Sequence, residues 1–236
     1  MNTKRWLACA MVGAMALGGC GSKEKDKDKG RSASPTTPSG LEGSTPPPGA
    51  GVNAPDAMGF TQLHDAAARR KGIEDLIRRG ADVNAKDKEI GWTALHWAAA
   101  DGDVEMISKL LAARADVDAT NLAGRTPLHE ACLSGQREAV EALLAARANP
   151  KLADSNGRTP LHCAVQANNR AIVELLLARR VDVNAAAKNG QTPLQIALVS
   201  GQGEIADLLR SHGAAPVKLP DRENPLPTPP PTTKPS

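Results

Sequence analysis

The sequence predicts an all-α fold, a solenoid of five short helix–turn–helix repeats flanked by disordered tails. A four-residue motif recurs at a nearly constant spacing, and an apolar helical stripe follows most of its copies. Both ends of the chain are instead rich in proline, glycine and charge. Aromatic residues make up only 2% of the chain, with one Phe and no Tyr, so Leu, Ile, Val and Ala must form the core. Such a core suits thin layers of closely packed helices.

Residues 1–19, MNTKRWLACAMVGAMALGG, begin with basic residues and continue through an apolar run to small residues. The apolar run is short for a bilayer span, and this order is typical of a secretory signal. The segment LGGC, ending at Cys20, resembles the cleavage box of bacterial lipoproteins, which implies lipidation of Cys20. Several acyl chains would make a stable membrane anchor. An ordinary signal peptide with a chance cysteine is the alternative.

The lipoprotein resemblance implies a place in the bacterial cell envelope. Gly21, which follows the lipidation site, is not the Asp that retains some lipoproteins at the inner membrane, so the outer membrane is slightly favoured. Residues 20–55 and 217–236 have too little apolar content to offset the entropy of ordering. We therefore expect a lipidated Cys and disordered tether over 20–55, and a proline-rich disordered tail over 217–236.

The charge balance argues against nucleic acid as a partner. The chain carries 29 basic and 26 acidic side chains, a formal net charge of +3. Removal of the signal with Lys4 and Arg5 would lower the net charge to +1. This is not the basic footprint of a nucleic-acid binder.

The recurring motif is TQLH, TALH, TPLH, TPLH and TPLQ, at intervals of 32, 33, 33 and 33 residues. Thr is a good helix N-cap, and Pro at the first helical position has its φ preset. The fourth residue can reach back to the cap, where a capping box has Glu or Gln. Gln195 replaces His there in the last repeat, which suits a cap and neither a ligand nor a base. We therefore assign structural caps to Thr61, His64, Thr93, His96, Thr126, His129, Thr159, His162, Thr192 and Gln195.

The stretch TPLHEAC places His129 three residues before Cys132, on one helix face. A base beside a nucleophile, or half of a metal site, would have this spacing. The recurrence favours structural roles, because equivalent histidines of stacked helices lie about 8–10 Å apart and zinc ligands must lie about 2.0–2.3 Å from one ion. We expect no catalytic residue and no metal site. Cys132 and Cys163 fall in different repeats and slots, which favours free thiols over a disulfide.

The second helix of each repeat carries its own apolar stripe, as in Met106, Ile107, Leu110 and Leu111. This is the buried face of an amphipathic helix. Gly102 and Gly135, with Asn168 in the fourth repeat, suit left-handed turns between the helices. In the last repeat Arg210 replaces the inner Leu, which would give the end of the stack a polar, capping face.

The period, the cap motif and the two helix patterns together resemble the ankyrin repeat family, over roughly Asp56 to Ala215. We place the repeat domain at residues 56–216. In that family, hairpin-like loops called fingers precede each cap. A left-handed residue ends each second helix, a site held here by Gly80, Arg114, Arg147 and Arg180. Family partners usually touch the finger tips and the exposed side of the first helices. Carried over, this implies partner-binding candidates Trp92, Trp97, Leu122, Arg125, Leu133, Asn156 and Arg158, with Glu130 among the other exposed first-helix positions.

The sequence therefore predicts a membrane-anchored, non-enzymatic protein-binding module, a scaffold or inhibitor of a periplasmic or cell-surface protein. A regulatory subunit of an enzyme in another chain, or a structural spacer, is the alternative. We expect no cofactor: GQGEIA at 201–206 matches a dinucleotide-binding pattern, but it aligns with an interhelix turn of an earlier repeat and only a proline-rich tail follows. The capping end repeats favour a monomer.

Overall fold

The computed structural model describes residues 51–216. The predicted signal peptide, Cys20, the tether up to residue 50 and the tail over 217–236 lie outside the described residues. Within 51–216 the chain forms ten helices and no strand, which confirms the all-α solenoid. The helices are α2 (Gln62–Arg69), α3 (Ile73–Arg78), α4 (Ala94–Asp101), α5 (Val104–Ala112), α6 (Pro127–Leu133), α7 (Arg137–Ala145), α8 (Pro160–Gln166), α9 (Arg170–Leu177), α10 (Pro193–Val199) and α11 (Gly203–Ser211).

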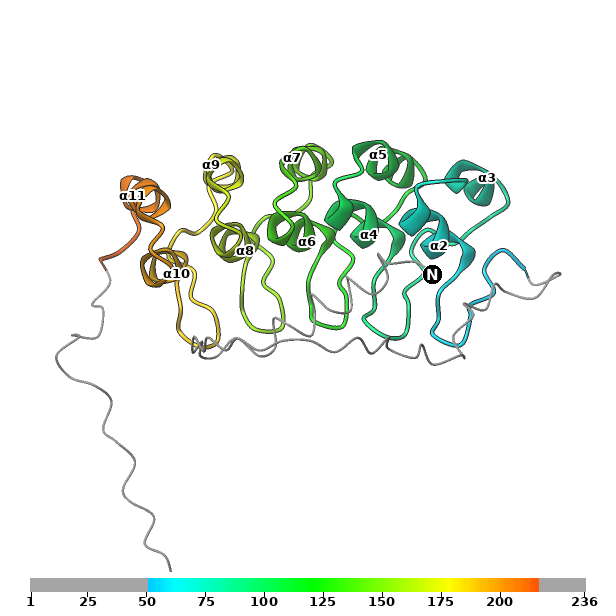
Figure 1. Ribbon diagram of the computed structural model, residues 1–236, viewed down its shortest axis with the longest axis horizontal. Helices are drawn as coiled ribbons and strands as arrows, with labels where there is room; N and C mark the ends of the chain where they lie inside the picture. Colours follow the sequence, from blue (N-terminus) through cyan, green and yellow to red (C-terminus); the bar gives the residue numbers. More distant parts are fainter. Residues whose placement is uncertain (1–50, 217–236) are drawn as a thin grey trace, which may run out of the picture.

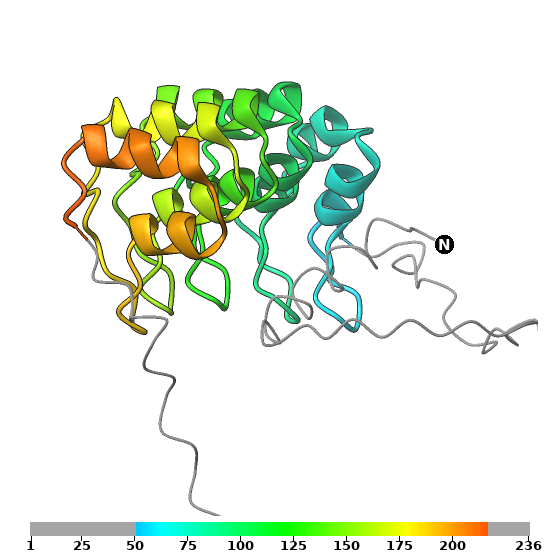
Figure 2. The ribbon, with the colours of Figure 1, turned by 60° about the vertical axis from the view of Figure 1, so that its left-hand side comes forward.

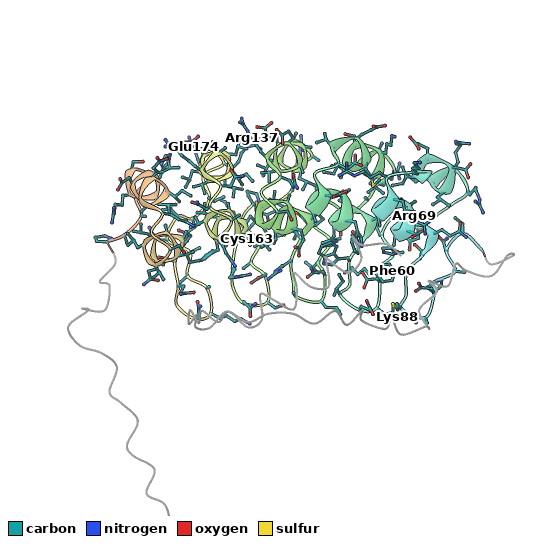
Figure 3. The ribbon with its side chains drawn as sticks, viewed as in Figure 1. Phe60, Arg69, Lys88, Arg137, Cys163 and Glu174 are labelled. Carbon is teal, nitrogen blue, oxygen red and sulfur yellow. The ribbon has the colours of Figure 1, made fainter. Side chains whose placement is uncertain are left out.

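The helices form two rows, as Figure 1 shows. The first helices α2, α4, α6, α8 and α10 make one row, and the second helices make the other. The fingers, residues 51–60, 81–92, 115–125, 148–158 and 181–191, project from the first row on the side away from the second, and the turned view in Figure 2 agrees. Arg137 and Glu174 lie on the second row, whereas Lys88 lies among the fingers (Figure 3). None of these helices combines the length and apolar character needed to cross a membrane.

Each first helix begins with the capping box that the motif predicts. In α6, Nδ1 of His129 accepts the backbone N–H of Thr126 at 3.1 Å and lies 2.9 Å from its hydroxyl. Gln195 has the same role in α10, where its Oε1 accepts the Thr192 N–H at 2.8 Å. The histidines have a second role: Nε2 of His129 lies 3.1 Å from the Arg158 carbonyl, so its N–H donates to the next repeat. Each cap histidine therefore joins two repeats.

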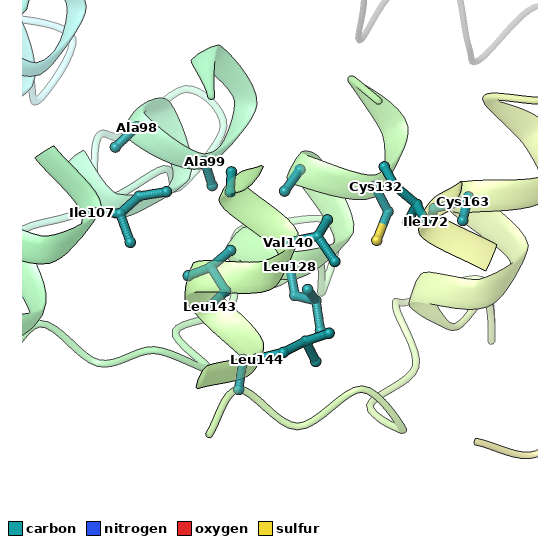
Figure 4. Packing of buried hydrophobic residues seen from close by; sticks show 14 of the residues in the cluster. Ala98, Ala99, Ile107, Leu128, Cys132, Val140, Leu143, Leu144, Cys163 and Ile172 are labelled. Atoms are coloured by element: carbon teal, nitrogen blue, oxygen red, sulfur yellow. The ribbon is translucent and has the colours of Figure 1, made fainter. Parts of the chain in front are cut away.

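The core lies between the two rows (Figure 4). Leu128 of α6 and Val140 and Leu143 of α7 are fully buried, as the stripe predicts. Cys132 and Cys163 are buried, free thiols in adjacent repeats.

The backbone at the helix ends follows the repeat pattern. Arg114, Arg147 and Arg180 have φ of 65°, 67° and 53°, in the left-handed region that the resemblance implied. Asn168 has φ of 52° at the interhelix turn where earlier repeats have glycine. In repeat one, Arg70 caps the end of the first helix and takes the left-handed conformation with φ of 56°.

The first finger begins earlier than the sequence suggested. Asn53 accepts the Asp82 N–H at 2.7 Å and donates to the Gly80 carbonyl at 3.0 Å. Asn184 makes the same pair of bonds with Ala215 and Gly213 at the other end of the stack. Residues 51–55 therefore belong to the stack, as the remnant of a preceding repeat, and the tether boundary expected at residue 55 is wrong.

Candidate functional site

The fingers form a hydrogen-bonded row. At the base of fingers two, three and four, the side chains of Asp87, Asn121 and Asp154 accept backbone N–H groups from their own finger. Neighbouring fingers are then joined along the backbone. The Leu122 N–H donates to the Ile90 carbonyl at 3.0 Å, and the Ser155 and Lys188 N–H groups make the equivalent bonds at 2.9 and 2.8 Å. These bonds fix the side chains that face the first helices.

A groove with a volume of about 700 Å³ runs beneath this row, between the fingers and the first helices. We call it the finger groove. Of the candidates from the sequence, Trp92, Leu122, Arg125, Asn156 and Arg158 line it, whereas Trp97 and Leu133 do not. The full lining is Glu89, Ile90, Trp92, Asn121, Leu122, Ala123, Arg125, Glu130, Asn156, Arg158, Ala187, Lys188 and Asn189.

The two tryptophans are core residues, which corrects the expectation that they are exposed contact residues. Trp92 and Trp97 are only 5% and 8% exposed. Their rings pack edge to face with centroids 4.9 Å apart, Trp92 stacks on His96, and Phe60 of the first finger lies 6.3 Å from Trp97. Such aromatic pairs each add roughly 0.5–1.5 kcal/mol beyond the burial of area. Trp92 lies just before the cap residue Thr93, and Trp97 lies four residues after it. The two rings therefore pack together, with Phe60 of the preceding finger beside Trp97.

A buried polar cluster lies at the middle of the groove, where the sequence predicted exposed residues. Glu130 occupies the position in α6 that Trp97 has in α4, and it is 6% exposed. Asn121 donates to its Oε1 at 3.1 Å, and Nη1 of Arg125 lies 3.9 Å from the same oxygen. Asp154 lies 3.5 Å from Nε of both Arg125 and Arg158.

Burial dominates the electrostatics of this cluster. Burial raises the pKa of Glu130 to about 7, against the lowering effect of Arg125 and of the Asn121 hydrogen bond. Nε of Arg125 is buried and has no hydrogen-bond partner. Arg158 is better satisfied, because its Nη1 donates to Gln166 at 2.8 Å.

Sequence reasoning missed Asn121 and Asp154. The signal for Asn121 was present, since the neighbouring fingers have Asp87 and Asp154 at the same base position. An amide there can donate to Glu130, where a second carboxylate would repel it. Nothing in the sequence indicated that Asp154 contacts Arg125, because this contact joins two repeats and forms only when they stack.

The histidines and cysteines have the properties of packed groups. Burial lowers the pKa of His96 and of His129 to about 4 each. Burial also raises the pKa of Cys132 well above its ordinary value and that of Cys163 to about 12, which keeps both thiols protonated. Across residues 51–216, no three His, Cys, Asp or Glu side chains are grouped so that they could hold a metal ion.

A stack of helix pairs with a row of projecting fingers and a groove beneath them defines a repeat solenoid that serves as a protein-interaction module. The family described as ankyrin repeats (3 copies) matches residues 63–154 and 146–219, well over half of the chain. The chain belongs to the ankyrin repeat family.

Curated relatives match short stretches of the chain. Protein phosphatase 1 regulatory subunit 27 from Homo sapiens is 38% identical over 65 residues, which are 27% of this chain and 42% of the relative. Palmitoyltransferase Hip14 from Drosophila melanogaster is 42% identical over 67 residues, 28% of this chain and 10% of the relative. Inhibitor of Bruton tyrosine kinase from Homo sapiens is 41% identical over 58 residues, 24% of this chain and 4% of the relative. The chain thus spans less than half the length of these relatives.

Proposed function

We propose that this protein is a membrane-anchored, non-enzymatic binding module that holds a protein of the bacterial envelope in the finger groove. The observation that carries the proposal is the groove itself, which combines a rim of apolar and charged side chains with buried charge. Leu122 is 70% exposed at this rim, while Arg125 is almost fully buried within the groove. Apolar surface around a few placed polar groups is what specific recognition of a partner requires.

The role within that class is the control of another protein. Two of the relatives are named as a regulatory subunit and as an inhibitor, which supports inhibition or regulation over passive scaffolding. A regulatory subunit of an enzyme in another chain is the second candidate, favoured by the first of those names. The buried histidines and protonated thiols offer no nucleophile or base, which supports a non-enzymatic role for the described residues.

The membrane anchor rests on the first twenty residues. The basic, apolar and small segments of 1–19, followed by LGGC, support a lipid on Cys20 and a place in the bacterial envelope. Metabolic labelling of the native host with palmitate tests this. The wild-type chain should incorporate label and sediment with membranes, whereas Cys20→Ala should do neither. An unlabelled wild-type chain would remove the anchor from the proposal.

Affinity capture from an envelope extract tests the groove. The bait is the full chain, the groove variant is Leu122→Asp, and the matched control is Val199→Asp, because Val199 is 74% exposed but does not line the groove. One protein held by the wild type and by the control, and lost by Leu122→Asp, is the expected result. Capture of the same proteins by all three baits would place binding elsewhere. No capture by any bait would favour a structural spacer.

A further inference from the structure

We propose that the middle of the finger groove is a carboxylate-binding site, which takes an Asp or Glu side chain of an extended segment of the partner. Arg125 is its main donor and Arg158 its second. The inference rests on the proposed function, since it assumes that the partner occupies the groove, and it adds the chemistry that the groove selects.

Arg125 is a buried cation with unmet hydrogen bonds. Its side chain is 11% exposed and lines the groove, and its Nε has no hydrogen-bond partner. The two nearby carboxylates lie at 3.5 and 3.9 Å, beyond the roughly 2.7–2.9 Å of a charge-assisted hydrogen bond. A guanidinium has five N–H donors and no acceptor. The ligand that suits it is a planar anion that accepts two of these bonds at once.

Asp154 cannot fill this role. Its Oδ1 already accepts the backbone N–H groups of Asn156 and Arg158 at 2.9 and 2.8 Å. Its Oδ2 is shared between two guanidinium groups at 3.5 Å, and its side chain is fully buried. These contacts hold Asp154 at 3.5 Å from Nε of both arginines.

The remaining charges leave the site positive when Glu130 is neutral. At the rim, Glu89 and Lys188 are both exposed, and their opposite charges sum to zero. Inside, Arg125 and Arg158 face Asp154 and Glu130, and burial raises the pKa of Glu130 to about 7. Near neutral pH Glu130 is therefore protonated in a large fraction of molecules, which leaves two cations against one anion.

The walls of the groove favour a peptide over a small anion. Leu122 stands 70% exposed at the rim, and Ile90, Ala123 and Ala187 line the groove on either side of the arginines. An extended segment with an acidic residue between apolar neighbours would cover these side chains and reach the guanidinium groups. Inorganic phosphate would leave the apolar surface in water.

The chain itself supplies matched variants. Arg125 precedes the cap threonine, the place that Gln191 has in the last repeat, so Arg125→Gln introduces a residue that the fold already accepts there. The backbone carbonyl that accepts the His96 N–H is kept. Glu130→Gln keeps an acceptor for Asn121 and removes the carboxylate that competes for Arg125. Arg125→Lys keeps the charge and loses the bidentate fork.

The test is a selection from an mRNA-display library of random linear peptides against the full chain. Peptides in this format have no free carboxyl terminus, so an acidic preference reports side chains. We expect the selected peptides to share an Asp or Glu between apolar residues. By fluorescence anisotropy, Arg125→Gln should weaken the best peptide by roughly tenfold or more and Arg125→Lys by less. At pH 7 Glu130→Gln should strengthen binding by about twofold, because about half of the wild-type molecules already have a neutral Glu130, and at pH 8 it should do so by more.

A double-mutant cycle isolates the contact from general damage. Replacing the acidic residue of the peptide by its amide should remove most of the difference between wild type and Arg125→Gln. Circular dichroism confirms that each variant folds. One outcome would overturn the carboxylate site and leave the groove function standing. In it, peptides bind and lose binding on Leu122→Asp, but they carry no acidic residue or bind both Arg125 variants as tightly as the wild type. A library that yields no peptide lost on Leu122→Asp would overturn both.

Discussion

At the scale of single residues, the cap histidines are held in one protonation state by two neighbours. Nδ1 of His129 must accept the Thr126 N–H at 3.1 Å, and its Nε2–H must donate to the Arg158 carbonyl at 3.1 Å. A proton on Nδ1 would make this nitrogen a donor, and it would then face the Thr126 N–H, which is also a donor. Burial is the main cause of the lowered pKa, and this geometry agrees with it.

The stability of the fold should therefore depend on these histidines below neutral pH. Their folded pKa, about 4 for His96 and His129, lies below the ordinary 6.5. Between these values the unfolded chain binds protons that the folded chain does not, so each histidine lowers the free energy of unfolding as pH falls. From pH 7.5 to 5 the loss is about 2 kcal/mol per histidine.

Urea unfolding of His129→Gln at the two pH values tests this, because Gln195 shows that Gln can cap in this motif. Glu130 opposes the histidines, since its pKa of about 7 makes its contribution more favourable at low pH. The quantity to compare is therefore the loss in the free energy of unfolding between the two pH values, measured in the wild type and in His129→Gln. The loss in the wild type alone would combine both effects. A variant with the same loss as the wild type would contradict the assignment.

A second residue-scale prediction concerns the left-handed arginines. Arg147 has φ of 67° at the site where repeat one has Gly80 with φ of 84°. Because a side chain is strained there, Arg147→Gly should stabilise the fold by about 1 kcal/mol, which corresponds to a rise in Tm of about 2–4 °C. Arg210→Gly, inside helix α11, is the control and should lower Tm. Scanning calorimetry decides between the outcomes, and an unchanged Tm for Arg147→Gly would show that the site carries no strain.

At the scale of elements, each first helix depends on its neighbours. Helices of seven or eight residues, such as α6 and α4, are too short to be stable alone in water. The caps set where the first helices begin, and the apolar stripes bury these helices against the second row. Each finger then positions the cap of the next repeat. The polar cluster is a product of this arrangement, because Asn121, Glu130 and Asp154 come from a finger, a helix and the next finger.

The pairing of Asn121 with Glu130 gives a prediction at this scale. Asn121→Asp keeps the oxygen that accepts the Arg125 N–H but places a second carboxylate beside Glu130. We expect a loss of about 1–2 kcal/mol at pH 8, where both groups would be charged, and a smaller loss at pH 6, where Glu130 is mostly protonated. Thermal melts at both pH values measure it. Asn156→Asp at an exposed finger tip is the control, and adding Glu130→Gln to the Asn121→Asp variant should restore the lost stability.

At the scale of the whole molecule, the stack is asymmetric. Phe60, Trp92 and Trp97, the aromatic side chains of the described residues apart from the histidines, all gather between the first two repeats. The positions of Trp92 and Trp97 are held by Arg125 and Glu130 in the third repeat, and by Arg158 and Cys163 in the fourth. In a solenoid each repeat contacts only its neighbours, so loss of one interface acts locally.

Removal of Trp92 should therefore uncouple the first repeat. Trp92→Ala should lower the free energy of unfolding by about 3–5 kcal/mol, as for other large buried aromatic residues. Leu122→Ala, at an exposed finger tip, should change it by less than about 0.5 kcal/mol. Chemical denaturation followed by circular dichroism measures both. Equal effects of the two substitutions would mean that the tryptophan pair does not hold the end of the stack.

The repeat architecture was determined by the sequence alone. The period and the Thr cap with His at N3 depend on interactions within one turn or one repeat, whereas the left-handed conformation of Arg147 was implied by the family resemblance. Part of the candidate site was also predictable, since five of the seven candidates, Trp92, Leu122, Arg125, Asn156 and Arg158, line the groove.

The tertiary structure alone decided which of these side chains are buried. Trp97 lies in the core because Phe60 and Trp92 cover it, and Asp154 meets Arg125 only after two repeats have stacked. Asn53 belongs to the fold because it bonds to a repeat almost thirty residues later. Burial and charge pairing depend on atoms brought from a neighbouring repeat, and the pattern of one repeat does not contain them.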